Sequence, residues 1–196
     1  WLNTFPPGDP VVDIVLSPGF SSDSTLLAMT RLAKVYRSED AGLTWALEVS
    51  FPQPPNNTVV PIGYDLEISP SFPSDDVLFA ATVDGLYKRT GQSSWSNVTS
   101  AQFPGIPILS VAVSPFFDNG YMGTNSEYTS VMAGSSGLGL LYSVEKGSVG
   151  SYAQVQIGST GIIPIVRMHP ALDANSTPDL LTYFYGFSSN ATIGTV

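Results

Sequence analysis

The stretch SEDAGLTW, residues 38–45, follows the apolar run KVY and places short polar, glycine and aromatic residues close together. These positions are Ser38, Asp40, Gly42, Thr44 and Trp45. In a tight hairpin, Ser and Asp side chains accept hydrogen bonds from backbone N–H groups that the turn leaves unpaired. Glycine supplies a positive φ, and tryptophan buries a large apolar group where the next strand begins. The stretch therefore predicts a structural hairpin between two outer strands rather than a catalytic cluster.

A repeat surrounds this hairpin. Four segments, which start at Val12, Tyr64, Leu109 and Ile163, each carry an apolar run followed by Ser or His and then Pro. The prolines of the motif lie 52, 45 and 55 residues apart, at Pro18, Pro70, Pro115 and Pro170. A unit of about 40 to 50 residues has the length of a four-stranded propeller blade. The chain is therefore predicted to consist of successive blades.

The strand pattern supports an all-β fold of β-propeller-type blades, each with four antiparallel strands. Apolar runs rich in β-branched and aromatic residues alternate with turn residues, and no segment shows a capped helical stripe. Strands are expected at 11–16, 25–30, 33–37, 45–50, 63–68, 77–82, 85–90, 94–99, 108–113, 129–134, 138–143 and 151–157. We expect a single domain of about three and a half blades, at about 11–57, 58–105, 106–161 and, in part, 162–196.

The hairpin sequence matches the pattern S-x-D-x-G-x-T-W, and in this it resembles the Asp-box of the BNR repeat β-propellers. That family includes sialidases, sortilin-type receptor domains, bacterial xyloglucanases and secreted bacterial repeat proteins. The resemblance implies a propeller fold. Later units depart from the pattern: the segment 90–95 keeps Trp95 and lacks the Asp, and the segment 144–152 keeps only Gly and an aromatic residue.

Three acidic residues are candidates for catalysis. Asp13 and Asp65 each lie five residues before a repeat proline, which places both on innermost strands. Asp84, in ATVDGLY, resembles the segment that carries an acidic catalyst in xyloglucanases. Glycosidases need two carboxylates about 5 to 9.5 Å apart. Acids that bond turns or face solvent are the alternative, and the arginines Arg37 and Arg89 are expected at matching positions on blade surfaces, not in a sialidase site.

Composition restricts the partners and the location. The formal net charge is −9, which disfavours nucleic acid and anionic membranes, and no apolar run is long enough to span a bilayer. The chain has no Cys, a single histidine (His169), and no EF-hand spacing around Asp75, Asp76 or Asp173, so we expect no metal and no cofactor. Four N-x-[ST] sequons, at Asn56, Asn97, Asn175 and Asn190, favour a glycosylated chain at the cell surface or outside the cell.

Two functions remain open from the sequence. The first is a non-enzymatic extracellular propeller module that binds a partner, with glycans among the candidates, or builds a surface structure. Three and a half blades are too few to close a ring, so the module is expected to self-associate, as a ring or filament, or to continue in further blades of the same polypeptide. The chain begins at Trp1 rather than Met, which suggests a processed chain or a segment. The second is part of a carbohydrate-active enzyme that uses Asp carboxylates in a propeller cleft.

Overall fold

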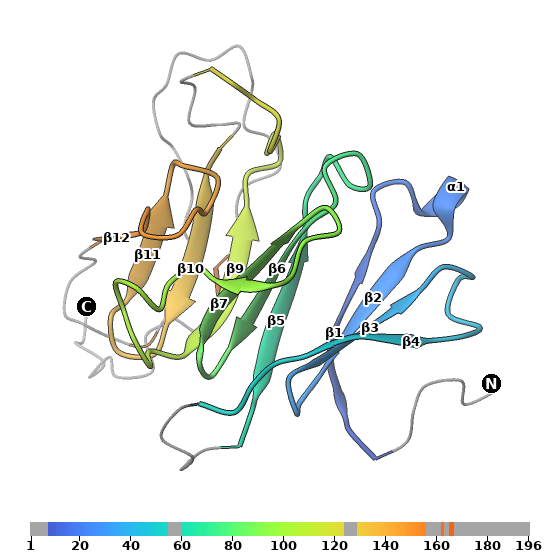
Figure 1. The fold of residues 1–196 in the computed structure, drawn as a ribbon, viewed down its shortest axis with the longest axis horizontal. Coiled ribbons are helices and arrows are strands. Elements are labelled where there is room, and N and C mark those ends of the chain that lie inside the picture. The colour runs from blue at the N-terminus through green and yellow to red at the C-terminus, as the bar shows by residue number, and fades with distance from the viewer. Residues whose placement is uncertain (1–7, 55–59, 124–128, 156–161, 163–164, 167–196) are drawn as a thin grey trace, which may run out of the picture.

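The computed structural model describes residues 8–54, 60–123, 129–155, 162 and 165–166. Within these ranges the chain forms three four-stranded antiparallel sheets, each a simple meander in which strands adjacent in sequence are hydrogen-bonded neighbours. Figure 1 shows the sheets side by side, from blue through green to orange. We call them blade 1, blade 2 and blade 3, and the packed interfaces between them seam 1–2 and seam 2–3. The predicted all-β fold of four-stranded blades is confirmed.

The strand bounds follow the expected pattern closely. Blade 1 contains β1 (Val11–Leu16), β2 (Leu26–Thr30), β3 (Lys34–Ser38) and β4 (Ala46–Ser50). Blade 2 contains β5 (Gly63–Ile68), β6 (Val77–Thr82), β7 (Gly85–Thr90) and β8 (Ser96–Asn97). Blade 3 contains β9 (Ile108–Val113), β10 (Val131–Ser135), β11 (Leu140–Ser143) and β12 (Ala153–Val155). The outer strands β8 and β12 are shorter than predicted, and the four-residue helix α1 (Phe20–Asp23) was not predicted.

Two apolar cores join the blades. The core of seam 1–2 includes Leu27, Met29, Leu66, Leu78 and Tyr87, and the core of seam 2–3 includes Phe79, Val111, Phe117, Val131 and Leu141. Strand β6 is buried along its whole length because its two faces serve different seams. A strand covered on both faces reads as a continuous apolar run, which is why VLFAAT shows no polar alternation.

Each sheet has one face toward the preceding blade, the N-side face, and one toward the following blade, the C-side face. The C-side face of blade 3 is buried and carries Ala112, Met132 and Leu140, against which Val166 packs. Apart from residues 162, 165 and 166, the predicted partial fourth blade lies outside the described residues.

The Ser-Pro motif closes the loop between the first two strands of blades 1 and 2. The Ser69 hydroxyl donates to Asp75 Oδ2 (2.6 Å) and accepts the N–H of Ser71 (3.1 Å), while Asp75 Oδ1 accepts the N–H of Val77 (3.2 Å). Ser17 and Asp23 make the same bonds in blade 1, where the Ser17 hydroxyl lowers the pKa of Asp23. The repeat therefore preserves a loop-closing pair.

In the described ranges, no helix has the length and apolar character required to cross a bilayer.

Candidate functional site

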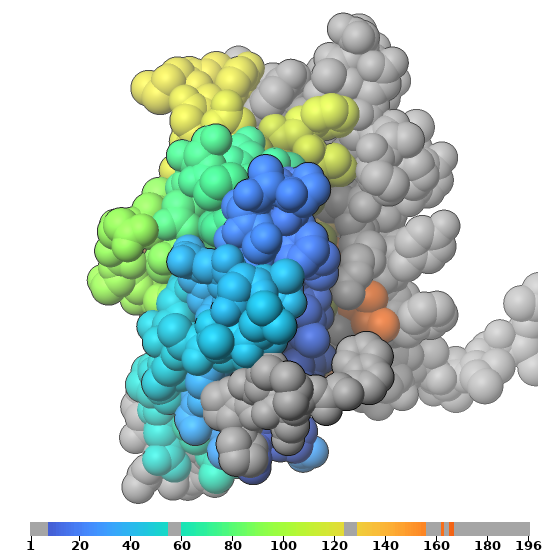
Figure 2. Space-filling view, turned by 90° about the vertical axis from the view of Figure 1, so that its right-hand side faces the viewer, coloured from blue at the N-terminus to red at the C-terminus, as the bar shows by residue number. Residues whose placement is uncertain are grey.

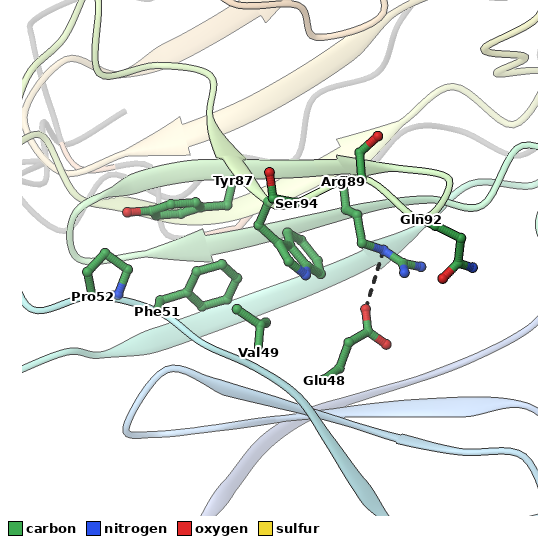
Figure 3. Close-up of a pocket in the computed structure, with 10 residues that line it drawn as sticks. Glu48, Val49, Phe51, Pro52, Tyr87, Arg89, Gln92 and Ser94 are labelled. Carbon is green, nitrogen blue, oxygen red and sulfur yellow. Dashed lines mark ion pairs between the residues drawn. The ribbon is translucent and has the colours of Figure 1, made fainter.

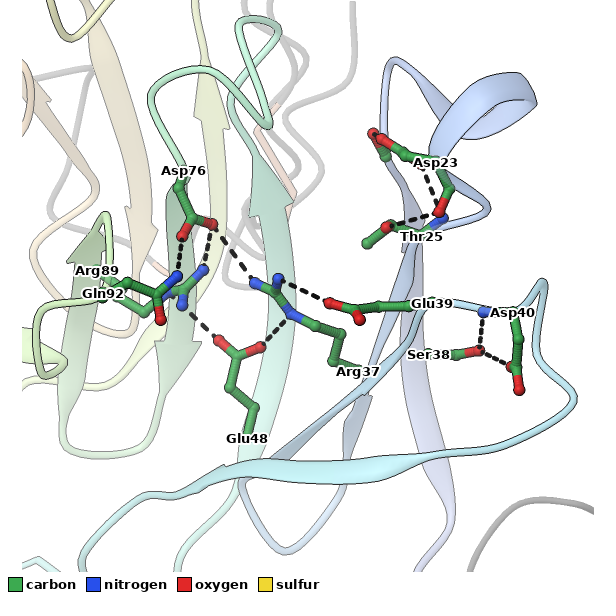
Figure 4. Close-up of polar contacts among 11 residues, drawn as sticks. Asp23, Thr25, Arg37, Ser38, Glu39, Asp40, Glu48, Asp76, Arg89 and Gln92 are labelled. Carbon is green, nitrogen blue, oxygen red and sulfur yellow. Dashed lines mark hydrogen bonds and ion pairs between the residues drawn. The ribbon is translucent and has the colours of Figure 1, made fainter.

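The SEDAGLTW hairpin forms the predicted turn between β3 and β4. The Ser38 hydroxyl donates to Asp40 Oδ1 (2.8 Å; Figure 4). It also accepts the N–H of Gly42 (2.8 Å). The Asp40 carboxylate accepts both the N–H (2.8 Å) and the hydroxyl (2.6 Å) of Thr44. Gly42 has φ +87°, in the region that favours glycine. All polar side chains of the motif are thus used within the hairpin.

These hydrogen bonds determine the ionisation of Asp40. The Thr44 hydroxyl, the Thr44 N–H and the Ser38 hydroxyl favour the charged carboxylate and lower the pKa of Asp40 to about 2. A carboxylate held in this state is a hydrogen-bond acceptor at neutral pH and not a general acid. The geometry supports a structural role for the motif.

A similar hairpin recurs in blade 3, where the sequence shows little of the pattern. The Ser143 hydroxyl accepts the N–H groups of Glu145 (3.1 Å) and Gly147 (3.3 Å), as Ser38 does for Asp40 and Gly42. The residue at each hairpin tip has a positive φ and donates its N–H to the loop that precedes the second strand of the same blade. These bonds are Ala41 to Ser24 O (3.0 Å), Gly91 to Asp76 O (3.1 Å) and Lys146 to Thr129 O (2.8 Å).

Asp13 and Asp65 lie on the innermost strands, as predicted, and both bond across a seam. Asp13 Oδ2 accepts the N–H of Leu66 (2.9 Å) in blade 2, and Asp65 Oδ2 accepts the N–H of Val111 (2.9 Å) in blade 3. Each acid sits just after an irregularity in its strand pairing. The matching residue in blade 3 is Ser110, whose buried hydroxyl has no hydrogen-bond partner among the described residues. The two candidate catalytic acids therefore serve as acceptors between blades.

Asp84 lies in the turn between β6 and β7, where its carboxylate accepts the Tyr87 hydroxyl (2.8 Å). Asn97 Nδ2 donates to the backbone oxygen of Asp84 (2.8 Å), and Asn97 Oδ1 accepts the N–H of Ser100 (3.0 Å). Gly85, at φ +133°, passes directly beneath this amide, and a Cβ there would lie 2.8 Å from it. Burial and the Asp84 hydrogen bond raise the pKa of Tyr87. The nitrogen of Asn97 that would carry a glycan is thus part of the turn.

A cluster of charges occupies the outer part of seam 1–2 (Figure 4). Arg37 Nε lies 2.8 Å from Glu48 Oε2, and Arg37 Nη2 lies 3.4 Å from Asp76 Oδ1. Arg89 also pairs with Asp76, and its Nε lies 3.3 Å from Glu48 Oε1 without alignment as a hydrogen bond. Two guanidinium groups and two carboxylates are therefore neutralised in one network that joins the blades.

The expectation that Arg37 and Arg89 lie at matching positions on blade surfaces is wrong. Arg37 pairs with Leu27, whereas the residue opposite Phe79 in blade 2 is Lys88, so Lys88 is the counterpart of Arg37. The offset arises because the β2–β3 turn is one residue longer than the β6–β7 turn. The two arginines instead approach each other in the seam, where Arg89 is only 7% exposed.

Lys88 lies in seam 2–3, and none of the carboxylates in the described part of the chain forms an ion pair with it. Its Nζ donates to Asn119 Oδ1 (3.1 Å) and to the backbone oxygen of Lys146 (2.8 Å), and it lies 5.6 Å from the centre of the Phe79 ring. Burial, aided by the nearby Lys146 charge, lowers the pKa of Lys88 to about 8. Arg37 and Lys88 thus occupy equivalent positions in the two seams. Arg37 forms ion pairs in seam 1–2, whereas Lys88 is partly desolvated in seam 2–3.

A hollow of about 590 Å³ opens beside the charge cluster (Figure 3). Blade 1 contributes Glu48, Val49, Phe51 and Pro52, and blade 2 contributes Tyr87, Arg89, Gln92, Ser93, Ser94 and Trp95. Phe51 lies with its ring centre 4.5 Å from that of Tyr87 and 5.2 Å from that of Trp95. Phe51 and Tyr87 are buried, so the accessible part of the hollow is the half-buried Trp95 ring beside the exposed Gln92, Ser93 and Ser94. This surface is suited to a neutral ligand with apolar and hydroxyl groups.

Several predicted positions lie outside the described residues: Asn56, His169, Asp173, Asn175 and Asn190. Among the described residues, no three His, Cys, Asp or Glu side chains gather as a metal site would require. Asp75 closes its own loop and Asp76 pairs with arginines, which accounts for the two acids considered as calcium ligands.

No family model matches the chain, and no curated protein matches it in sequence. Solved structures do match in fold. An ancestral GH74 enzyme gives a TM-score of 0.59 at 17% identity over 84% of this chain and 21% of that one. YCF48 from Cyanidioschyzon merolae gives 0.55 at 10% identity over 81% and 45%, and the GH74 enzyme of Niastella koreensis gives 0.53 at 17% identity over 79% and 24%. The match thus spans about a fifth to a quarter of the GH74 enzymes and under half of YCF48. At these identities the likeness shows the fold alone, which is that of a β-propeller.

Proposed function

We propose that this chain is a non-enzymatic extracellular β-propeller module of the Asp-box type, which binds a partner or builds a surface structure. The observation that carries the proposal is the use of the acidic candidates: Asp13 and Asp65 accept backbone N–H groups across seams. Asp84 is likewise bonded to Tyr87 within its own blade. Acids engaged in this way hold blades and turns together.

The Asp-box assignment rests on the geometry of two hairpins. Ser38 and Ser143 accept equivalent pairs of backbone N–H groups, and Asp40 adds the bonds to Thr44. A hydroxyl used in the same way in two blades is the mark of a repeated structural device.

The hollow in seam 1–2 is the binding surface that we propose for a glycan. Its arginine and its glutamate are already neutralised by ion pairs, and Gln92 Nε2 donates to Asp76 Oδ2 (3.3 Å). Its free binding capacity therefore lies in the half-buried Trp95 ring and in the exposed Ser93 and Ser94 side chains. Binding of soluble neutral polysaccharides, measured by calorimetry, should weaken about tenfold or more in Trp95→Ala, because stacking on an aromatic ring is lost. Leu43→Ala, in the Asp-box turn, is the matched control.

Self-association, glycosylation and an extracellular or cell-surface location complete the proposal. The four sequons support the last two, and intact mass of the native chain tests them through added hexose units. We expect Asn97 to be the least occupied of the four, because its Nδ2 already donates to Asp84. Full occupancy at Asn97 would show that this turn bond does not protect the amide.

The second candidate is part of a carbohydrate-active enzyme. It is favoured by the position of Asp84, whose carboxylate holds the hydroxyl of Tyr87, a residue that lines the hollow. Hydrolysis of plant and bacterial polysaccharides by the full chain, compared with Asp84→Asn and Asp84→Ala, separates the candidates. We expect no turnover by any of the three. Turnover that both substitutions abolish, with folding unchanged, would replace the non-enzymatic proposal with this one.

A further inference from the structure

Lys88 and Asn119 bring an amine and a carboxamide into contact across seam 2–3. Lys88 lies on β7 of blade 2, and Asn119 lies in the loop that follows β9 of blade 3. Lys88 Nζ is 3.1 Å from Asn119 Oδ1. Because a C=O bond is about 1.2 Å long, Nζ lies within about 4.4 Å of Asn119 Cγ at any angle of approach. The two groups that could join as an amide are therefore neighbours in the folded chain.

Further hydrogen bonds hold the two side chains together. The backbone oxygen of Asn119 accepts Lys146 Nζ (2.7 Å), and Lys88 Nζ also donates to the backbone oxygen of Lys146 (2.8 Å). The Ser71 hydroxyl of blade 2 donates to the backbone oxygen of Phe117 (3.1 Å), two residues before Asn119. Figure 2 shows the loop after β9, in yellow, next to the green loop between β5 and β6. An amine and a carboxamide fixed against each other in this way meet the main requirement of a fast intramolecular reaction.

The surroundings of Lys88 favour the neutral amine, which is the nucleophilic form. Nζ lies 5.6 Å from the centre of the Phe79 ring, and no carboxylate of the described residues forms an ion pair with it. Burial and the Lys146 charge lower the pKa of Lys88 to about 8, against the opposing effect of the Asp75 charge. About a tenth of the amines are thus neutral at pH 7, whereas an exposed lysine is almost entirely protonated.

The carboxamide also lies beside solvent and acidic groups. Asn119 lines an open hollow of about 570 Å³ together with Asp75, Asp118 and Gly120. This hollow offers ammonia a route into solvent. Its carboxylates can accept and return a proton, directly or through one water molecule.

We propose that Lys88 and Asn119 form an intramolecular isopeptide bond that joins blade 2 to blade 3. The neutral Nζ attacks Cγ and forms the new N–C bond, the Cγ–Nδ2 bond breaks, and one Nζ proton passes to Nδ2, which leaves as ammonia. The atoms balance without an oxidant, a reductant or a cofactor. Most of the amine is protonated at neutral pH, so the reaction is slow and freshly prepared chain retains the free lysine. The bond gives seam 2–3 a covalent link at the position where Arg37 forms ion pairs in seam 1–2.

Intact mass of the full chain, followed during incubation at pH 9, provides the first test. We expect the loss of one ammonia from the unmodified chain and from the control Lys146→Arg, because Lys146 Nζ bonds the backbone oxygen of Asn119 and not its carboxamide. Lys88→Arg and Asn119→Ala should keep their full mass, with folding checked by circular dichroism. Trypsin cuts after Arg37, Arg89 and Lys146, so the bond should join the peptides 38–89 and 90–146 in a digest.

A second test separates the isopeptide bond from a competing reaction. The backbone nitrogen of Gly120 can also attack Asn119 Cγ and expel ammonia, which gives a succinimide and joins no peptides. Gly120→Ala hinders that attack, and the backbone at this position, which has no positive φ, accepts alanine. We expect Gly120→Ala to cross-link as the unmodified chain does. The rate should rise about tenfold from pH 7 to pH 9 and then level off, because Lys88 is then neutral.

Two results would overturn the proposal. Ammonia loss that persists in Lys88→Arg without joined peptides, or that stops in Gly120→Ala, would assign the reaction to the succinimide. An unchanged mass after prolonged incubation at pH 9 would show that the contact between Lys88 and Asn119 is a hydrogen bond and nothing more.

Discussion

The carboxylate of Asp13 accepts the backbone N–H of Leu66 across seam 1–2, with 2.9 Å between oxygen and nitrogen. Asp65 and Val111 repeat this relationship across seam 2–3 at the same distance. Because the donor is a backbone group, the bond fixes how far one innermost strand slides along the next. The acid of one blade thereby sets the position of the following blade.

Replacement of Asp65 by Ala should destabilise the chain by about 1 to 3 kcal/mol, because it leaves the buried Val111 N–H without its carboxylate partner. Asp65→Asn keeps an acceptor and should cost less. Ser110→Ala, at the matching position of blade 3, should cost almost nothing, since its hydroxyl has no partner among the described residues. Urea denaturation measures all three. An equal loss in Asp65→Ala and Ser110→Ala would contradict the role of the aspartate.

The hairpin hydrogen bonds of Asp40 should appear as a pH dependence of stability. Its pKa is about 2 in the folded chain and about 3.8 in the unfolded chain, so its stabilising effect is present above pH 4. That effect should disappear as the pH falls from about 4 to about 2, because the unfolded chain binds the proton more readily. Thermal melts of the chain and of Asp40→Asn should converge over this interval. A constant difference between them would show that the Asp40 bonds do not lower its pKa.

Local sequence patterns accounted for most of the strands and for the Asp40 hairpin. Runs such as VLFAAT are buried on both faces, and the partners of Ser38 and Asp40 lie within six residues along the chain. The use of Asp13 as an acceptor could not be predicted in this way, because Leu66 is 53 residues away and approaches only when the blades pack. Spacing placed both acids on innermost strands but could not show what their oxygens contact.

Small differences in loop length explain one wrong expectation and one hairpin that was not predicted. One extra residue in the β2–β3 turn shifts Arg37 out of register with Arg89, so a constant repeat spacing pairs the wrong residues. In blade 3 the aromatic residue Tyr152 follows Gly147 by five positions, whereas Trp45 follows Gly42 by three. Because of this longer spacing, the Ser143 hairpin does not match the S-x-D-x-G-x-T-W pattern. The pattern that the two hairpins share is a Ser followed two residues later by an acidic residue and four residues later by Gly.

The charge cluster of seam 1–2 should depend on arginine geometry. Arg89→Ala leaves Glu48 and Asp76 partly buried with less compensation, and we expect a loss of about 3 to 5 kcal/mol in the free energy of unfolding. Arg89→Lys should restore little, because a lysine cannot reach two carboxylates in a planar fork. Glu39→Gln is the control: that side chain is 71% exposed and should contribute under about 1 kcal/mol. Full rescue by lysine would indicate that charge alone stabilises the seam.

Lys88 should make the chain more stable as the pH rises from about 8 toward 10. Its pKa is about 8 when folded and about 10.5 when unfolded, so in this interval the unfolded chain binds more protons and stability rises with pH. From pH 8 to 9.5 the unmodified chain should gain about 2 kcal/mol relative to Lys88→Met, which carries no charge in either state. Urea midpoints of both chains at several pH values provide the measurement, and the comparison removes the contribution of tyrosines whose raised pKa acts in the opposite direction above pH 10. Parallel profiles for the two chains would show that Nζ stays solvated in seam 2–3, and that the hydrogen bonds to Asn119 and Lys146 do not take it out of water.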